Sequence, residues 1–257
     1  MKLLVDGDEL VYRQCTVSTY EQEWPNGMVS VDVDADEVVA DVERRIQTMV
    51  TKVGADDHVL AFSCASKDVW RKDLDPSYKE DRDHRRKPPA YGLVVERLRE
   101  RHRVLTFPRL EADDILGIMQ TRPKPTVIAG QDKDFLTLAG TVINPKTLDV
   151  QEVTPEEADL NHLLQALMGD KTDGYSGCPG IGKVRAERIL VPLMGDLPAM
   201  WAAVVKTFES KGLTADDALL NARLARIVRD EDWDRKNKRV RYWTPPEVLS
   251  QTDTQDA

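Results

Sequence analysis

Short apolar segments separated by stretches with helical spacing constrain this fold more than any other feature. The apolar segments are 2–6, 58–62, 103–107 and 126–130, and Asp34 starts a helix whose apolar face ends before Gly54. Strands that alternate with helices usually pair in parallel within a sheet covered on both faces. The sequence therefore predicts an α/β fold with a mainly parallel central sheet flanked by helices. A turn signal at 24–27 predicts a small hairpin within 16–33.

Acidic residues follow three of the predicted strands. Asp6 ends the first, a group of three acids begins the helix after the third, and Asp132 and Asp134 follow the fourth. In open α/β sheets, ligands bind outside the carboxyl ends of the strands. Asp6 is therefore either a site residue or the N-cap of the next helix. Acids in the first turn of a helix are also favoured by the helix dipole, so this group alone has a structural explanation.

A glycine-rich loop follows a helical pattern at 155–168 and precedes a second helix that begins near Val184. Asp170 and Asp173 lead into it, and glycines stand at 174, 177, 180 and 182. Glycine is useful where φ is positive or where a ligand approaches the backbone closely. The loop is therefore either a phosphate cradle at a helix N-terminus or a flexible connection between two helices. The candidate DNA contacts here are Gly177, Gly180, Ile181, Gly182, Lys183 and Arg185.

The acids from these segments predict a metal site. If they lie close together without cations, their pKa values rise and the fold is destabilised. Oxygen ligands without histidine or cysteine select Mg²⁺ or Mn²⁺ over zinc. The candidate ligands are Asp6, Glu111, Asp113, Asp114, Asp132, Asp134, Asp170 and Asp173.

Basic residues gather in two segments of a 257-residue chain whose net charge is −9. Residues 67–103 contain twelve Lys/Arg and eight Asp/Glu, and residues 223–241 contain eight Lys/Arg and four Asp/Glu. Each segment either follows the phosphates of a nucleic acid or forms a solvated helix face. Tyr78 lies among the cations of the first segment, where Lys79 and Arg82 either meet phosphate or pair with neighbouring acids.

The three cysteines, at 15, 64 and 178, are widely spaced and form no Cys-x-x-Cys pair. They predict neither a disulfide framework nor a zinc site. The N-terminal apolar run is too short for a signal peptide, and no later run reaches membrane-spanning length. We therefore expect a cytoplasmic protein without a membrane partner.

The order of these motifs resembles the 5′-nuclease family, which comprises flap endonucleases and 5′→3′ exonucleases, and most closely its phage-encoded members. The motifs run from 4–8 through 70–72, 76–82, 87–92, 111–114, 132–135 and 169–177 to 225–229. The resemblance implies a PIN-like nuclease core at 1–152, with an arch or loop at 67–90. It also implies a helical duplex-binding subdomain at 153–245, with a helix–three-turn–helix at 156–191 and a polar tail at 246–257.

By this resemblance, Asp6, Glu111, Asp113 and Asp114 form one metal cluster, and the remaining four candidate acids form another. Lys79 and Arg82 are then active-site cations at the base of the arch, Tyr78 helps to place the terminal nucleotide, and Arg71 contacts DNA. The implied mechanism is two-metal hydrolysis of a phosphodiester bond, with two or more ions per site. The loop at 174–182 is expected to hold the duplex through a monovalent ion such as K⁺.

The expected substrate is DNA with a 5′ end, flap or nick, or an RNA–DNA hybrid, and the expected state is a monomer in the cytoplasm, that of the host if the chain is phage-encoded. One position departs from the family pattern, because Cys64 stands where the family has an aspartate. Asp68 is the alternative supplier of that charge. Two other functions stay open: a DNA-binding relative with weakened catalysis, and a PIN-like ribonuclease.

Overall fold

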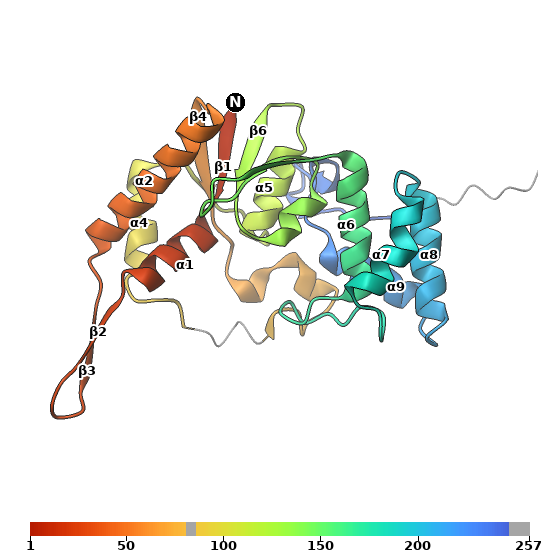
Figure 1. The fold of residues 1–257 in the computed structure, drawn as a ribbon, viewed down its shortest axis with the longest axis horizontal. Coiled ribbons are helices and arrows are strands. Elements are labelled where there is room, and N and C mark those ends of the chain that lie inside the picture. The colour runs from red at the N-terminus through yellow and green to blue at the C-terminus, as the bar shows by residue number, and fades with distance from the viewer. Residues whose placement is uncertain (81–85, 247–257) are drawn as a thin grey trace, which may run out of the picture.

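A six-stranded sheet forms the centre of the computed structural model, which describes residues 1–80 and 86–246 (Figure 1). The strands in spatial order are β5 (Val104–Leu105), β4 (Asp57–Ala61), β1 (Lys2–Asp6), β6 (Thr126–Ala129), β7 (Gly140–Ile143) and β8 (Val150–Val153). All neighbours are parallel except β7 and β8, which pair antiparallel. The predicted α/β fold with a mainly parallel sheet is confirmed. The third strand is shorter than predicted, and β7 and β8 were not predicted.

Helices cover both faces of the sheet. The helices α1 (Gly7–Val17), α2 (Ala35–Val53) and α4 (Tyr91–Arg101) pack on one face, where Leu3 and Val5 point. The helix α5 (Ala112–Gln120) packs on the other face, where Leu4 points. Side chains of a strand alternate between faces, and burying each of these aliphatic side chains stabilises the fold by about 1.5–3 kcal/mol. The predicted caps of α2 are confirmed, since Asp34 caps its start and Gly54 its end.

Four helices beside the sheet enclose a core of their own (Figure 1). They are α6 (Pro155–Met168), α7 (Lys183–Leu190), α8 (Leu197–Glu209) and α9 (Ala215–Ala225). Thr154 and Glu157 form a reciprocal capping box that fixes the start of α6 directly after β8. The helices α6 and α7 flank the glycine-rich loop, and the assignment of 156–191 as a helix–three-turn–helix stays a prediction.

After α9 the chain returns to the α/β core. Ile227 and Val228 pack in the apolar cluster beneath α5, and the hairpin of β9 (Trp233–Asp234) and β10 (Arg239–Val240) lies at its edge. Trp243 then packs among the helices. The prediction of one helical subdomain over 153–245 is therefore wrong for 226–241. The predicted tail begins at residue 246, and the rest of it lies outside the described residues.

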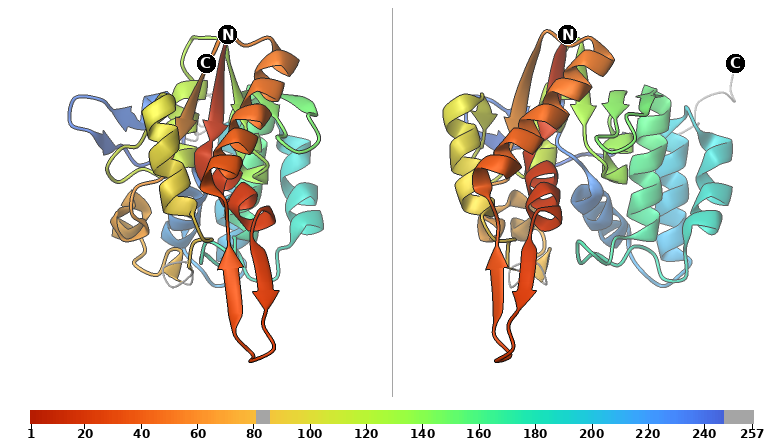
Figure 2. Two further views of the ribbon diagram at one scale, coloured as in Figure 1. Left: turned by 90° about the vertical axis from the view of Figure 1, so that its left-hand side faces the viewer. Right: turned by 60° about the vertical axis from the view of Figure 1, so that its left-hand side comes forward.

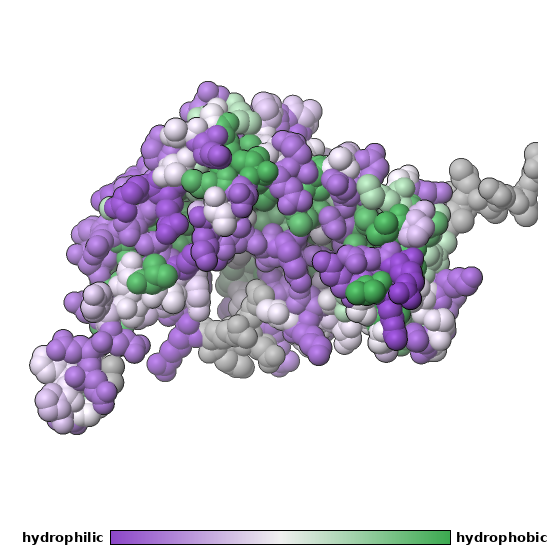
Figure 3. Space-filling model, in the orientation of Figure 1, coloured by the Kyte–Doolittle hydropathy of each residue, from purple (hydrophilic) through white to green (hydrophobic). Residues whose placement is uncertain are grey.

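The predicted hairpin is present as β2 (Tyr20–Glu23) and β3 (Val29–Asp32), and it projects from the body of the molecule as an arm (Figures 1 and 2). Hydrophilic residues dominate the visible face in Figure 3. Within the described ranges, no helix is long and apolar enough to cross a membrane. The described residues also form the 3₁₀ helices η1 (Ser66–Asp68), η2 (Trp70–Asp73), η3 (Lys133–Thr137), η4 (Val191–Leu193) and η5 (Asp230–Asp232).

Candidate active site

The carboxyl ends of β1 and β6 bring the first acids together. Asp6 ends β1 and also caps α1, since one of its carboxylate oxygens accepts a hydrogen bond of 3.1 Å from the Glu9 N–H. The N-cap interpretation of Asp6 is therefore confirmed, and its role as a site residue stays a prediction. Asp132 follows β6 and caps η3, where it accepts a hydrogen bond of 2.9 Å from the N–H of Asp134. Because β1 and β6 are parallel neighbours, these acids lie at one edge of the sheet.

The loop after α6 approaches the same edge by docking on residues 77–79. The Lys79 N–H donates to the backbone oxygen of Asp173 at 3.0 Å. Gly174, at φ 87°, packs against this segment so closely that a Cβ there would lie 3.2 Å from the backbone oxygen of Ser77. The structure thus joins two segments that are about a hundred residues apart in the sequence.

Lys79 is the cation at the centre of this junction. Its Nζ lies 2.7 Å from Glu111 Oε1 and 3.3 Å from Asp173 Oδ2, and its side chain is 12 % exposed. The backbone of Lys79 is in the left-handed region, with φ 54°. That conformation costs a non-glycine residue on the order of 1 kcal/mol and is found most often at functional sites. The lysine is therefore held between carboxylates from two different parts of the chain.

Tyr78 supports the same carboxylates from inside the protein. Its hydroxyl oxygen lies 3.0 Å from Asp173 Oδ2 and 3.2 Å from Glu111 Oε2. Only 2 % of Tyr78 is exposed, so its ring cannot stack on a terminal nucleotide. The role predicted for Tyr78 is therefore wrong, and the residue positions acids instead.

Arg71 and Asp114 form a buried ion pair. Arg71 is 3 % exposed and Asp114 is fully buried. The guanidinium group donates to both oxygens of Asp114, at 2.8 and 2.9 Å, and to Glu111 at 2.7 Å. Asp114 also accepts from the Trp70 indole N–H and the Val228 backbone N–H. The prediction that Arg71 contacts DNA is wrong, because its guanidinium group is buried against Asp114 and Glu111. Both carboxylate oxygens of Asp114 accept from these buried donors, which corrects its predicted role as a metal ligand.

The remaining acids influence one another's ionisation. Burial and repulsion from neighbouring carboxylates raise the pKa of Asp6 to about 8 and that of Asp134 to about 7. Burial and the charge of Asp6 also raise the pKa of Asp113 far above its usual range. Burial opposes ionisation of Glu111 as well, but Lys79 and Arg71 outweigh it and lower the Glu111 pKa to about 2. The cluster therefore holds more negative charge than its cations balance.

The acid cluster does not form a closed ligand shell as it stands. In the part of the chain that the structure describes, no three acidic, histidine or cysteine side chains lie close enough to enclose an ion. Gln165 extends the oxygen-rich surface: its Nε2 donates to Asp134 Oδ1 at 2.5 Å, and its buried Oε1 has no hydrogen-bond partner among the described residues. Sequence reasoning missed Gln165, because an isolated glutamine in a helix belongs to no recognisable motif.

Asp170 lies on the outer side of the cluster with an exposed lysine. Lys133 Nζ lies 3.3 Å from Asp170 Oδ2. Burial would raise the Asp170 pKa, but the Thr172 N–H and Lys133 lower it below its usual value. Asp170 thus ionises more readily than Asp134, whose pKa is raised.

One part of the glycine loop is buried in the protein, and another part exposes its backbone to solvent. Gly177 is buried at φ 63°, its N–H donates to Asn221 Oδ1 at 2.9 Å, and a Cβ there would lie 2.2 Å from the Gly169 nitrogen. The prediction that Gly177 contacts DNA is therefore wrong, because its backbone is used inside the loop. Gly180 and Gly182 are exposed, and a Cβ on Gly182 would meet nothing within 4 Å.

The start of α7 presents the other candidate contacts. Lys183 and Arg185 are exposed, Ile181 is half-buried, and no side chain caps the helix at Gly182. Arg185 Nη1 donates to the Gly180 carbonyl at 2.8 Å, which ties the helix to the loop. The geometry therefore leaves a cationic helix N-terminus open to solvent.

Cys64 lies next to the chain segment that carries Glu111. It is half-buried, its N–H donates to the Leu110 carbonyl at 3.0 Å, and burial raises the pKa of its thiol. Asp68 is exposed in η1. Arg82 falls within 81–85, outside the described residues, as does that part of the predicted arch.

Comparisons with known proteins agree with this arrangement. A model of the 5′-3′ exonuclease N-terminal, resolvase-like domain matches residues 1–162. The exodeoxyribonuclease of Enterobacteria phage T3 is 29 % identical over 95 % of this chain and 92 % of its own length. The exonuclease of Escherichia phage T7 is 26 % identical, with 95 % and 93 % covered. Flap endonuclease Xni of Aeromonas salmonicida is 31 % identical, with 74 % and 79 % covered.

A solved structure shows the same fold over most of the chain. The bacteriophage T5 flap endonuclease, in a complex with DNA and metal ions, superposes with a TM-score of 0.65 at 18 % identity. The match covers 87 % of this chain and 88 % of that one. The sequence match spans more than half of the chain, and it coincides with the sheet whose carboxyl edge carries the acids. The chain therefore belongs to the 5′-3′ exonuclease family of nucleases.

Proposed function

We propose that this chain is a divalent-metal-dependent 5′-nuclease that hydrolyses phosphodiester bonds near the 5′ end of DNA. One observation carries the proposal: Lys79 lies 2.7 Å from Glu111 and 3.3 Å from Asp173, at the edge of the sheet where Asp6 and Asp132 also lie. A lysine among carboxylates on a nuclease fold is suited to contact a phosphate group whose charge is also balanced by bound metal ions.

The donor chemistry of the cluster fits hard divalent cations. The available groups are carboxylate oxygens, with the unpartnered Gln165 Oε1 beside them. Burial and neighbouring carboxylates raise the pKa values of Asp6 and of the half-buried Asp134, and bound cations would favour the ionised form of both groups. Mg²⁺ or Mn²⁺ suits such oxygens. The proposed ligands are Asp6, Glu111 and Asp113 in one group, and Asp132, Asp134, Asp170 and Asp173 in the other.

When bound, a pair of divalent ions supplies an activated water and neutralises charge on the phosphate. The protein's own groups position the substrate and stabilise charge. Lys79 has an ammonium group that can turn from Glu111 toward a phosphate oxygen, where it would stabilise the charge that develops in the transition state. Tyr78 keeps Glu111 and Asp173 oriented through its buried hydroxyl. Arg71 holds Glu111 from the opposite side.

The loop at 174–182 and the start of α7 form the proposed duplex-binding surface. Gly180 and Gly182 leave the backbone accessible, and Lys183 adds an exposed charge. Backbone N–H groups at a helix N-terminus bind phosphate oxygens without regard to base sequence. A K⁺ ion between the loop and a phosphate is part of this proposal, and replacing K⁺ by a larger organic cation at constant ionic strength should weaken duplex binding.

The deciding experiment is digestion of 5′-labelled duplex, flap and RNA–DNA hybrid substrates with Mg²⁺ or with EDTA. We expect Mg²⁺-dependent release from the 5′ end, and Asp134→Asn should lower the turnover by about 10²- to 10³-fold. Asp149→Asn, a change at an exposed acid in the β7–β8 turn, is the control and should cut normally. Equal turnover in wild type and Asp134→Asn would contradict the proposed chemistry.

A second candidate is a DNA-binding relative with weakened catalysis, and Cys64 in place of the family's aspartate is the observation that favours it. Binding of flap DNA without cleavage at any Mg²⁺ or Mn²⁺ concentration would select it. Cleavage of single-stranded RNA but not of DNA would instead select a PIN-like ribonuclease. Sedimentation of the free protein would test the expected monomer.

A further inference from the structure

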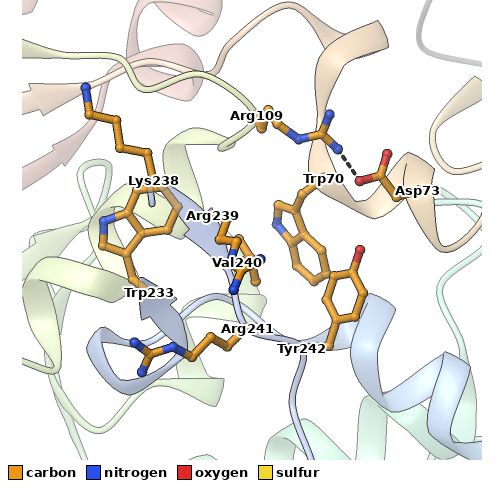
Figure 4. A pocket seen from close by; sticks show the side chains of 9 residues that line it. All are labelled: Trp70, Asp73, Arg109, Trp233, Lys238, Arg239, Val240, Arg241 and Tyr242. Carbon is orange, nitrogen blue, oxygen red and sulfur yellow. Dashed lines mark hydrogen bonds and ion pairs between the residues drawn. The ribbon is translucent and has the colours of Figure 1, made fainter. Parts of the chain in front are cut away.

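A cavity of about 360 Å³ lies between η2 and the β9–β10 hairpin (Figure 4). Trp70 and Asp73 of η2 form one side, and Trp233 and Val240 of the hairpin form the other. None of the acids proposed to hold metal ions lines it. Its volume falls within the range of about 300–1,000 Å³ that is usual for small-ligand sites. The cavity is therefore separate from the proposed active site.

Cations dominate this cavity although the chain carries a net charge of −9. Asp73 is the only acid in the described lining, and Arg109 already pairs with it. Arg239 and Arg241 also form longer ion pairs with Asp234, at 3.7 and 3.9 Å, and Asp234 does not line the cavity. Four cationic side chains line the cavity: Arg109, Lys238, Arg239 and Arg241. This excess of positive charge favours an anionic ligand.

Two of these cations occupy strained backbone positions. Arg109 has φ 68°, and Lys238, in the turn between β9 and β10, has φ 51°. Glycine or asparagine is the usual choice in the left-handed region, and other residues cost on the order of 1 kcal/mol there. Both strained positions therefore carry long cationic side chains that line the cavity.

Aromatic rings also line the cavity. Trp70 is only 3 % exposed and closes the inner end, where Tyr242 stacks on it at a centroid distance of 5.8 Å and an angle of 28°. Tyr242 is 39 % exposed and Trp233 is partly exposed on the opposite side (Figure 4). Accessible rings among cations are typical of surfaces that stack nucleobases and bind the phosphates next to them.

We propose that this cavity is a nucleotide pocket that binds one nucleotide of a single-stranded nucleic acid. The base would lie against Tyr242 or Trp233, and the adjoining phosphates would meet the cations. A nucleoside monophosphate has one phosphate, whereas the cations on both sides of the cavity can contact several phosphates of a strand. A duplex cannot enter, because its bases are stacked and paired. The inference rests on the proposed function only in taking nucleic acid as the substrate.

Equilibrium binding without cleavage tests the pocket. Fluorescence anisotropy of a 5′-fluorescein-labelled decathymidylate would be measured with the full chain in EDTA. We expect an abasic strand of equal length to compete about tenfold more weakly, because base stacking is lost. Thymidine monophosphate and inorganic phosphate should compete more weakly still. Equal competition by the abasic strand would overturn base recognition, and equal competition by thymidine monophosphate would overturn the assignment to a strand.

Two substitutions in the β9–β10 turn distinguish binding in the pocket from general electrostatic attraction between the strand and the protein. Lys238→Gly removes a lining cation at a backbone conformation that glycine prefers, so the melting temperature should not fall. It should weaken binding of the labelled strand about three- to tenfold. Lys236→Ala removes the same charge from the same turn outside the lining and should change affinity less than twofold. Equal losses in both variants would refute the pocket.

A charge reversal provides the second variant. Arg239→Glu should weaken binding of the strand by more than tenfold and reduce the dependence of affinity on salt concentration. An unchanged affinity would also refute the pocket. Because these measurements need no metal and no cleavage, they can fail while 5′-end hydrolysis is present, and they can succeed while hydrolysis is absent.

Discussion

Replacing Arg71 by methionine should destabilise the whole protein, because Arg71 is the counter-ion of a fully buried carboxylate. Its guanidinium group makes five hydrogen bonds of 2.6–3.1 Å, two of them to Asp114 and one to Glu111. Methionine fills a similar volume but leaves the charge of Asp114 uncompensated. Breaking a buried pair in this way costs about 3–5 kcal/mol. For a chain of this size that corresponds to a fall of roughly 6–20 °C in melting temperature.

Urea unfolding followed by far-UV circular dichroism measures this cost. Arg44→Met is the control, because Arg44 is exposed and its ion pair with Asp41 should contribute less than about 1 kcal/mol. Adding Asp114→Asn to Arg71→Met should recover about 1–3 kcal/mol relative to the sum of the single changes, because the unpaired charge is gone. A cost below about 1 kcal/mol for Arg71→Met, or strictly additive effects, would refute the reasoning.

Three further predictions concern the site. Lys79→Ala should lower turnover by about 10²-fold or more while changing DNA affinity in Ca²⁺ much less, because its cation acts on the transition state; the reverse ranking would contradict its position. Gly182→Ala should weaken duplex binding while leaving the unfolding free energy and cleavage of a short single strand nearly unchanged, since a Cβ there meets no protein atom; equal losses on both substrates would argue against a duplex contact. Cys64→Asp should lower the Mg²⁺ concentration for half-maximal rate and Cys64→Ser should keep Mg²⁺-dependent activity. If Asp68→Asn alone raises that concentration, Asp68 supplies the charge instead.

Local patterns in the sequence predicted the sheet and most of its helices. The strands β1, β4 and β6 were found because each is a continuous apolar run, and α2 was found because an apolar face lies between Asp34 and Gly54. The strands β7 and β8 were missed because only part of each is buried, so neither shows a strong apolar pattern. Periodicity therefore predicts an element when one face of it is fully buried.

The site was predicted less completely because its side chains are placed by contacts distant in the sequence. Arg71, Tyr78 and Gly177 have residue types that suit DNA contacts, yet all three are buried. Their burial depends on α9 and its end, because Leu224 and Arg226 supply backbone acceptors of Arg71, Tyr78 packs beside Leu224, and the Gly177 N–H donates to Asn221. No local pattern indicated these contacts. Lys79 was predicted as an active-site cation, whereas its backbone contact with Asp173 was visible only in three dimensions.

The return of the chain after α9 has a consequence for cooperativity. The guanidinium group of Arg71 donates to the carbonyls of Leu224 and Arg226, and Asp114 accepts from the Val228 N–H. The last segment of the helical part is thus inserted between groups of the α/β core. A chain cut after residue 152 would lack these partners, so the core could not be isolated as an autonomous folding unit. The two parts should unfold in a single transition, and limited proteolysis should yield no stable 1–152 fragment.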